Sequence, residues 1–220
     1  MIPSLDGPRL SPAFGGPARQ LVVILHGYGA DGADLIDLGR AWQGQLPDAA
    51  FAAPDAPEHL SFEALGGRQW FALHERSPDE YRIGAGAAQA VLDRFLDEEL
   101  ARLSLDGSAL AIVGFSQGAM MAMQCGLRRR MPPAALIGYS GLLPGAGRLD
   151  GINTASPVLI VHGMEDDVVP HYHAEAAQKA LISAGVPSQH HLLPRLGHSI
   201  DERAMVLGGR FLEEAFAAVK

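Results

Sequence analysis

Cysteine is nearly absent from this chain of 220 residues, whose single thiol, Cys125, excludes an internal disulfide. Cysteine pairs at the spacing of zinc sites are therefore absent too. Because a lone cysteine in an apolar stretch is usually a small core residue, we expect Cys125 to be buried. Two histidine pairs, His171/His173 and His190/His191, have no matching set of further ligands, so we expect neither a metal nor another cofactor.

Positive charge is also scarce. Lysine and arginine number 17 against 25 acidic residues, which gives a net charge of −8 with histidine neutral. The basic run Arg128–Arg130 lies at the end of a predicted helix, where cations stabilise the negative pole of the helix dipole. A chain this acidic lacks the electrostatic footprint of a nucleic-acid-binding protein, and we expect no nucleic-acid partner.

No apolar run approaches the ~20 residues that a membrane-spanning helix requires. The first 17 residues hold four prolines but no apolar core of the kind a signal peptide has. We therefore expect a cytoplasmic protein that does not insert stably into membranes. Residues 1–19 are interpreted as a Pro/Gly-rich lead, and residues 20–220 as one domain.

Within that domain, short apolar runs alternate with longer amphipathic stretches. The predicted strands are Leu21–Leu25, Ala50–Ala53, Leu110–Val113, Leu136–Tyr139, Val158–Val161 and His190–Leu193. The predicted helices are Ile83–Leu103, Gln117–Arg130, His173–Ala184 and Asp201–Val219. Since continuously apolar strands are covered on both faces, the pattern predicts an α/β domain with a mostly parallel central sheet flanked by helices. Residues 40–82, broken by prolines and glycines, predict one strand and then a long excursion typical of a binding loop or lid.

The run Gly114-Phe115-Ser116-Gln117-Gly118 has the form of a nucleophile elbow, a tight strand-to-helix turn that exposes a serine. An apolar strand precedes it and a helical pattern follows it. Glycines two positions before and after the serine allow the strand and the helix to pass closely. The alternative is an ordinary Gly-rich turn with an incidental serine. We favour Ser116 as a nucleophile.

A serine nucleophile needs a histidine base and a carboxylate that orients it, and in nucleophile-elbow folds these follow in the order acid, then base. Asp166 and His198 each follow a predicted strand, at the sheet edge where α/β proteins build their sites. Asp167 is the rival acid and Glu165 a remote third. His162 precedes the acid loop, and we expect it to brace that loop.

Acyl transfer also requires N–H groups directed at the developing oxyanion. The backbone N–H of Gln117, just after the nucleophile, is one candidate. The other is the N–H of Tyr28 in the glycine-rich turn Leu25-His-Gly-Tyr-Gly29, which follows the first strong strand. A plain Gly-rich turn between strand and helix is the alternative for that segment.

Several separated segments together resemble the phospholipase/carboxylesterase family of α/β-hydrolases, which includes bacterial carboxylesterases and acyl-protein thioesterases. The matching segments are Leu25-His-Gly-Tyr-Gly-Ala-Asp-Gly32, Gln69-Trp-Phe71, Gly114-Phe-Ser-Gln-Gly118, Ser140-Gly-Leu-Leu-Pro144, His162-Gly-Met-Glu-Asp-Asp-Val-Val-Pro170 and Gly197-His198. The resemblance implies a single-domain α/β-hydrolase fold without a large cap domain. It also implies a triad of Ser116, Asp166 and His198, with the Tyr28 and Gln117 amides as oxyanion hole.

Family members often have a shallow acyl groove covered by the excursion before the second helix. The resemblance maps this cover to Leu60–Leu73 and implies that Trp70 and Phe71 bind substrate as the groove wall. A satellite core under the excursion is the alternative, and a homodimer contact fits exposed aromatic residues equally well. Where the family often has aspartates, this chain has Ala72 and Met164.

Together these features predict a cofactor-free serine hydrolase that cleaves carboxylic esters, or thioesters, of small or acyl-chain substrates through an acyl-enzyme on Ser116. Within that activity, deacylation of the acyl-protein thioesterase or lysophospholipase type is the alternative. A non-catalytic binding protein on the same fold and a serine peptidase or amidase are rivals of other classes.

Overall fold

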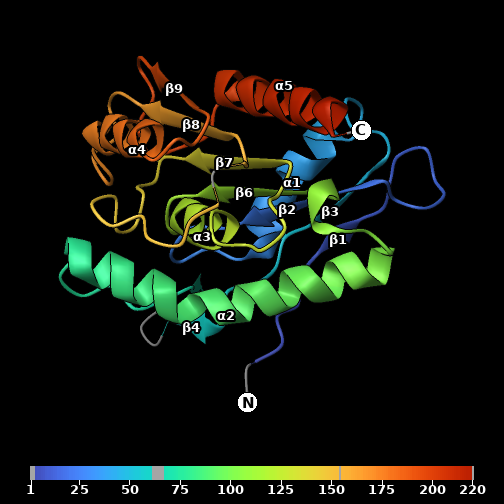
Figure 1. Cartoon of the computed structure of the whole chain (residues 1–220), viewed down its shortest axis with the longest axis horizontal. Coiled ribbons are helices and arrows are strands. Elements are labelled where there is room, and N and C mark those ends of the chain that lie inside the picture. The colour runs from blue at the N-terminus through green and yellow to red at the C-terminus, as the bar shows by residue number, and fades with distance from the viewer. Residues whose placement is uncertain (1–2, 61–66, 154, 220) are drawn as a thin grey trace.

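The computed structural model describes residues 3–60, 67–153 and 155–219. Within these ranges, seven strands form one sheet in the order β1-β3-β2-β6-β7-β8-β9 (Figure 1). The strands are β1 (Arg9–Leu10), β2 (Gln20–Leu25), β3 (Ala49–Ala52), β6 (Leu110–Phe115), β7 (Ala135–Tyr139), β8 (Val158–Gly163) and β9 (Ser188–Leu193). Every neighbouring pair is parallel except β1 with β3, which confirms the predicted mostly parallel sheet.

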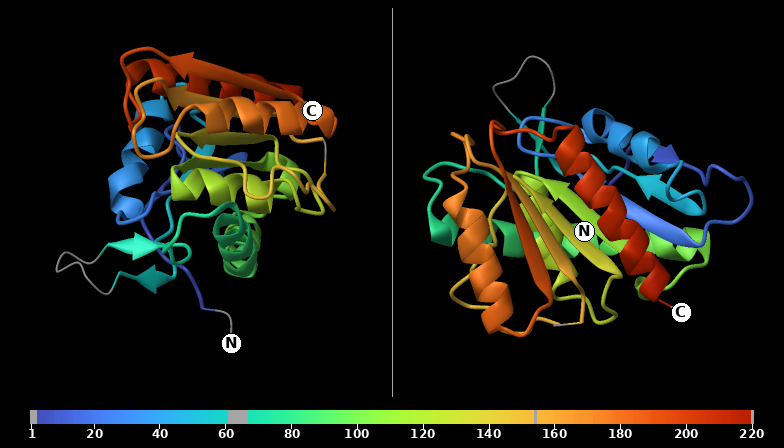
Figure 2. Two further views of the ribbon diagram at one scale, coloured as in Figure 1. Left: turned by 90° about the vertical axis from the view of Figure 1, so that its left-hand side faces the viewer. Right: turned by 90° about the horizontal axis from the view of Figure 1, so that it is seen from above.

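Helices cover both faces of the sheet (Figures 1 and 2). The helices are α1 (Gly32–Trp42), α2 (Pro78–Leu103), α3 (Gln117–Gly126), α4 (Tyr172–Ser183) and α5 (Glu202–Ala218), with a short 3₁₀ helix η1 at Gly107–Ala109. Helices α1 and α5 pack on one face, and α2, α3 and α4 on the other. In β2, Val22 and Ile24 pack on the face covered by α1 and α5. Leu21, Val23 and Leu25 pack on the opposite face, which α2, α3 and α4 cover. This alternation explains why the strand is apolar at every position.

All six predicted strands are present, with ends within two residues of those expected. Two helix boundaries were wrong. Helix α2 begins at Pro78 and not at Ile83, because Ser77 caps it and proline is well tolerated in the first turn. Helix α3 ends at Gly126 and not at Arg130.

Helix α1 was not predicted at all. Asp31 caps its N-terminus, and the Asp31 carboxylate accepts hydrogen bonds from the Ala33 and Asp34 N–H groups. Just beyond α3, the Arg128 guanidinium donates to the Gln124 carbonyl of that helix, as expected for the basic run. Arg129 instead forms ion pairs with α2.

The lead packs against the edge of this sheet, whereas part of the excursion projects from it. Arg9 of the lead pairs with Ala52 through β1, and its guanidinium contacts the buried carboxylate of Glu99 on α2. The excursion holds a two-stranded hairpin, β4 (Glu58–His59) and β5 (Arg68–Gln69), which projects from the sheet (Figure 2). The domain boundary at residue 20 stays a prediction.

Burial of Cys125 is confirmed. Its thiol donates to the Asp93 carboxylate, and burial raises the pKa of this thiol well above its usual range. Among the described helices, none is both long enough and apolar enough to cross a bilayer.

Candidate active site

Ser116 occupies a sharp turn between β6 and α3, with φ 54° and ψ −116°. Such a conformation is costly for a residue with a side chain and is retained where its surroundings enforce it. The flanking glycines provide those surroundings. A Cβ on Gly118 would lie 2.1 Å from the Leu25 carbonyl oxygen, and one on Gly114 would lie 2.1 Å from the Gly118 oxygen. The motif therefore requires glycine at both positions for steric reasons.

His198 lies in the loop after β9 and is in hydrogen-bonding contact with the serine. Its Nε2 is 3.0 Å from Ser116 Oγ, and its Nδ1 is 2.8 Å from Asp166 Oδ2. The Phe115 ring packs against the imidazole at a centroid distance of 4.9 Å. These contacts fix the ring between the hydroxyl and the carboxylate.

The Asp166 carboxylate is fully buried and held in place by the backbone. Its Oδ1 accepts from the N–H groups of Val168, at 3.0 Å, and Val169, at 2.8 Å, so Oδ2 is left for the histidine. The rival carboxylates of Asp167 and Glu165 are both exposed. The structure thus brings Asp166, and neither rival, to His198.

His162 lies beneath the acid loop and contacts it directly. Its Nε2 is 2.7 Å from the Val169 carbonyl oxygen and 3.1 Å from Asp166 Oδ2, so this nitrogen carries the proton and donates. Within the described part of the chain, its buried Nδ1 has no hydrogen-bond partner. Burial lowers the pKa of His162, which keeps the ring neutral. The histidine holds the acid loop, as expected from the sequence.

Tyr28 and Gln117 line the same cavity as Ser116 and His198. Within the described residues, the backbone N–H of neither Tyr28 nor Gln117 has an acceptor, so both are free for a ligand oxygen. The turn that carries Tyr28 is held on one side by a hydrogen bond from the Gly29 N–H to the Arg68 carbonyl, 2.8 Å long. The carbonyl of the next residue, Ala30, accepts a second backbone hydrogen bond from the Arg68 N–H at 3.0 Å.

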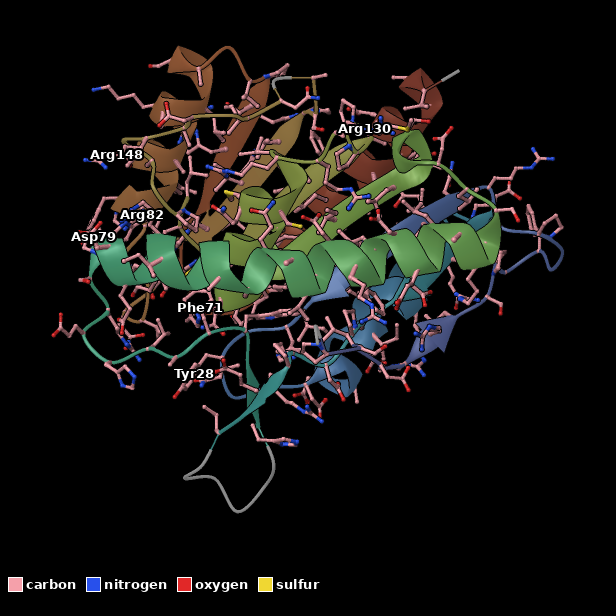
Figure 3. The ribbon with its side chains drawn as sticks, turned by 60° about the horizontal axis from the view of Figure 1, so that its bottom comes forward. Tyr28, Phe71, Asp79, Arg82, Arg130 and Arg148 are labelled. Atoms are coloured by element: carbon pink, nitrogen blue, oxygen red, sulfur yellow. The ribbon has the colours of Figure 1, made fainter. Side chains whose placement is uncertain are left out.

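Trp70 and Phe71 do not line this cavity. Trp70 is 1% exposed and Phe71 5%, and a Cβ on Gly84 of α2 would clash with the Phe71 ring, which packs closely against that helix (Figure 3). The Gln117 side chain binds both residues, since it accepts from the Trp70 N–H at 2.9 Å and donates to the Phe71 carbonyl at 2.7 Å. Their position corrects the expected groove wall: they buttress the nucleophile turn from behind.

The indole of Trp70 also supports the loop that carries Tyr28. Its Nε1 donates to the His26 carbonyl at 3.0 Å. The buried His26 ring accepts from the Ala56 N–H at Nε2 and donates from Nδ1 to the Gly27 carbonyl. Burial lowers the pKa of His26, consistent with a neutral ring.

The cavity over the serine has a volume of about 190 Å³. Leu73 and Tyr81 line it in the place expected for the two aromatic residues, together with Met120 of α3. Leu73 is the last residue of the cover that the resemblance mapped, whereas the sequence offered no signal for Tyr81. Of the predicted cover, residues 61–66 lie outside the described residues.

The histidine pairs do not assemble a metal site. Among the described residues, no group of three or more histidine, cysteine or acidic side chains could hold an ion.

The family model for Phospholipase/Carboxylesterase matches residues 13–215. The chain is 30% identical to the esterase YpfH of Escherichia coli over 86% of this chain and 80% of that protein. It is 29% identical to acyl-protein thioesterase 1 of Schizosaccharomyces pombe over 74% of this chain and 75% of the other. The crystal structure of esterase PE8 superposes with a TM-score of 0.91 and 40% identity, over 96% of this chain and 99% of that one.

Proposed function

Because the chain belongs to the phospholipase/carboxylesterase family of α/β-hydrolases, whose chemistry is hydrolysis of esters or thioesters, we propose that Ser116, His198 and Asp166 are its catalytic triad. One observation carries the assignment. The imidazole of His198 lies between the two other groups, 3.0 Å from the hydroxyl and 2.8 Å from the carboxylate.

In the first half of the reaction, Ser116 Oγ attacks the acyl carbon while His198 Nε2 accepts its proton. The negative charge that develops on the carbonyl oxygen is stabilised by the N–H groups of Tyr28 and Gln117. Collapse of this intermediate breaks the ester bond, and His198 returns the proton to the leaving alcohol or thiol. Water then repeats the sequence on the acyl-enzyme and frees Ser116.

The surroundings of Asp166 suit its proposed role, which is to hold His198 and to stabilise the imidazolium formed during attack. Two backbone N–H groups bind one carboxylate oxygen and leave the other for the histidine. His162 adds a neutral donor without adding a positive charge beside the base. The buried carboxylate therefore acts on a single cationic partner, the imidazolium of His198.

The substrate class follows from the cavity at Ser116. Its volume of about 190 Å³ supports a small acyl group or the first part of a longer one. Relatives named as acyl-protein thioesterases support thioesters as a second class of substrate. Oxygen esters of small carboxylic acids are our first choice, because the relatives matched over 86% and 96% of this chain, YpfH and PE8, are both named esterases.

The test is hydrolysis of p-nitrophenyl esters from acetate to palmitate by wild type, Ser116→Ala and Ser183→Ala. Ser183 is an exposed serine on α4 whose hydroxyl bonds only its own helix, which makes it a matched control. We expect Ser116→Ala to lose at least about 10⁴-fold in kcat while the control retains wild-type activity. Substantial hydrolysis by purified Ser116→Ala would refute the triad.

A further inference from the structure

A second and larger cavity, of about 620 Å³, adjoins the one over Ser116. The two cavities share four lining residues, Arg76, Tyr81, Val168 and Val169. The larger one lies between the first turns of α2 and α4 and the segment after β7. A substrate held at Ser116 can therefore extend past Arg76 and Tyr81 into this second space.

The larger cavity is positively charged in an acidic protein. Three arginines, Arg76, Arg82 and Arg148, line it against a single carboxylate, that of Asp79. Figure 3 shows Arg82, Arg148 and Asp79 together at the N-terminal end of α2. The net charge of the whole chain is −8, so this local excess of cations is opposite to the average surface.

Most of this positive charge is uncompensated. Arg82 pairs with Asp79 at 3.1 Å. Among the described residues, Arg76 and Arg148 form no ion pair with any carboxylate. Glu75, next to Arg76 in the sequence, is exposed and does not line the cavity. Glu80 is already bound by three backbone N–H groups, at residues 74 to 76. His173 also lines the cavity, and burial lowers its pKa, so it adds no acid and little charge at neutral pH.

The rest of the lining is largely apolar. It includes Leu142 and Leu143 after β7, Val168 and Val169 of the acid loop, and Ala176 and Ala177 of α4. A cavity with this lining suits an apolar segment that ends in an anionic oxygen group, because guanidinium groups bind such oxygens through paired N–H donors.

The backbone geometry holds two of the arginines at the cavity. The Arg76 N–H donates to the Glu80 carboxylate, and this hydrogen bond holds the Arg76 backbone at a φ of 53°. The aliphatic stem of Arg82 lies over Gly145, where a Cβ would come within 3.3 Å of its Cγ and Cδ. The start of α4 adds a partial positive charge, since its cap residue His171 makes no side-chain cap hydrogen bond.

We propose that the preferred substrates of this enzyme are esters that carry an anionic oxygen group, such as a carboxylate, at the far end of an apolar chain. Arg76, Arg82 and Arg148 bind that group in the larger cavity while the ester lies at Ser116. This inference rests on the proposed esterase function and specifies its substrate class.

Two matched pairs of substrates test the proposal on the two sides of the ester bond. The first pair comprises p-nitrophenyl monoesters of dicarboxylic acids, from adipate to sebacate, and the same compounds with the free carboxylate converted to a carboxamide. The second comprises acetate esters of ω-hydroxy acids and of the corresponding ω-hydroxy amides. For each pair, the measured quantity is the ratio of kcat/KM for the carboxylate over the carboxamide.

We expect wild type to favour the carboxylate about tenfold in at least one pair, at the chain length that reaches the arginines. Arg148→Gln and Arg76→Gln should each lower that ratio about fivefold, mainly through KM, since a partly exposed ion pair contributes up to ~1 kcal/mol. Arg148→Glu should lower it further. Because the ratio is internal to each variant, a loss of folded protein does not change it.

Arg130→Gln is the matched control. Arg130 is exposed and lies far from Arg82 and Arg148 in Figure 3, outside both cavities. It should keep the wild-type ratio. Raising the salt concentration should reduce the wild-type ratio, because salt screens exposed charges.

Ratios near one in both pairs, or ratios unchanged in Arg76→Gln and Arg148→Gln, would overturn the anionic-substrate proposal and leave the esterase function standing. If wild type hydrolysed no member of the four substrate series, both the anionic-substrate proposal and the esterase function would be overturned.

Discussion

The most informative single substitution is Asp166→Asn. In the structure, Oδ1 of Asp166 accepts from the Val168 and Val169 N–H groups and Oδ2 accepts from His198. An asparagine keeps one acceptor oxygen but replaces the other with a donor NH₂ group. Turning that NH₂ toward the two backbone N–H groups would leave buried donors unsatisfied, at about 1–3 kcal/mol each. We therefore expect the amide oxygen to stay with the backbone and the NH₂ group to face His198.

This orientation reverses the histidine tautomer. To meet an NH₂ group, His198 must present a lone pair at Nδ1 and carry its proton on Nε2, which then faces Ser116 and cannot accept the serine proton. Loss of the correct tautomer is expected to lower kcat by about 10³–10⁴-fold with little change in fold. Steady-state hydrolysis of p-nitrophenyl butyrate and urea unfolding of the same preparations measure the two effects.

Asp167→Asn is the control, because Asp167 is exposed beside the same loop. It should keep nearly wild-type activity. An Asp166→Asn enzyme that retains more than about a tenth of wild-type kcat would contradict the role of Asp166, as would a larger loss of activity in Asp167→Asn.

Three further predictions concern stability. Gly118→Ala should destabilise the fold by about 1–3 kcal/mol or more and reduce activity, because its Cβ would lie 2.1 Å from the Leu25 oxygen; wild-type urea unfolding would contradict this. Burial lowers the pKa of His162 below its ordinary value of 6.5. Its contribution to the free energy of unfolding is therefore complete above pH 6.5 and is lost as the pH falls below that value. Urea unfolding at several pH values should show that the free energy of unfolding falls less steeply with decreasing pH in His162→Gln than in wild type. Equal pH dependence in the two proteins would contradict this prediction. Arg9→Gln should lower the free energy of unfolding in urea by about 1–2 kcal/mol, because it leaves the buried Glu99 carboxylate without one of its ion-pair partners. Arg19→Gln is the control and should unfold like wild type; equal losses in the two variants would contradict this prediction.

The sheet was predictable because its strands are buried on both faces and therefore apolar at every position. Helix α1 was not, because two of its four buried positions are Gly32 and Gly39. A Cβ at Gly32 would lie 1.9 Å from the Ala53 oxygen, so close packing removes the apolar side chains that a periodicity search needs. The Asp31 cap was the remaining signal in the sequence.

For the candidate site, the order of motifs along the chain was enough to select Ser116, Asp166 and His198, which the structure brings into contact. Whether Trp70 and Phe71 face substrate depends on how the excursion packs against α2, which no local pattern specifies. The positively charged cavity was beyond prediction as well, because Arg148 comes from the segment after β7, far along the chain from Arg76 and Arg82. The cytoplasmic location and the homodimer contact stay predictions.

The central claim is that Ser116 is the nucleophile of a serine hydrolase, and the most direct test is covalent. A fluorophosphonate reacts with an activated serine in place of the ester carbonyl, and peptide mapping by mass spectrometry identifies the modified residue. We predict one adduct per chain, on Ser116, with no labelling of a folded Ser116→Ala protein. Labelling of a different residue, or undiminished labelling of Ser116→Ala, would contradict the account.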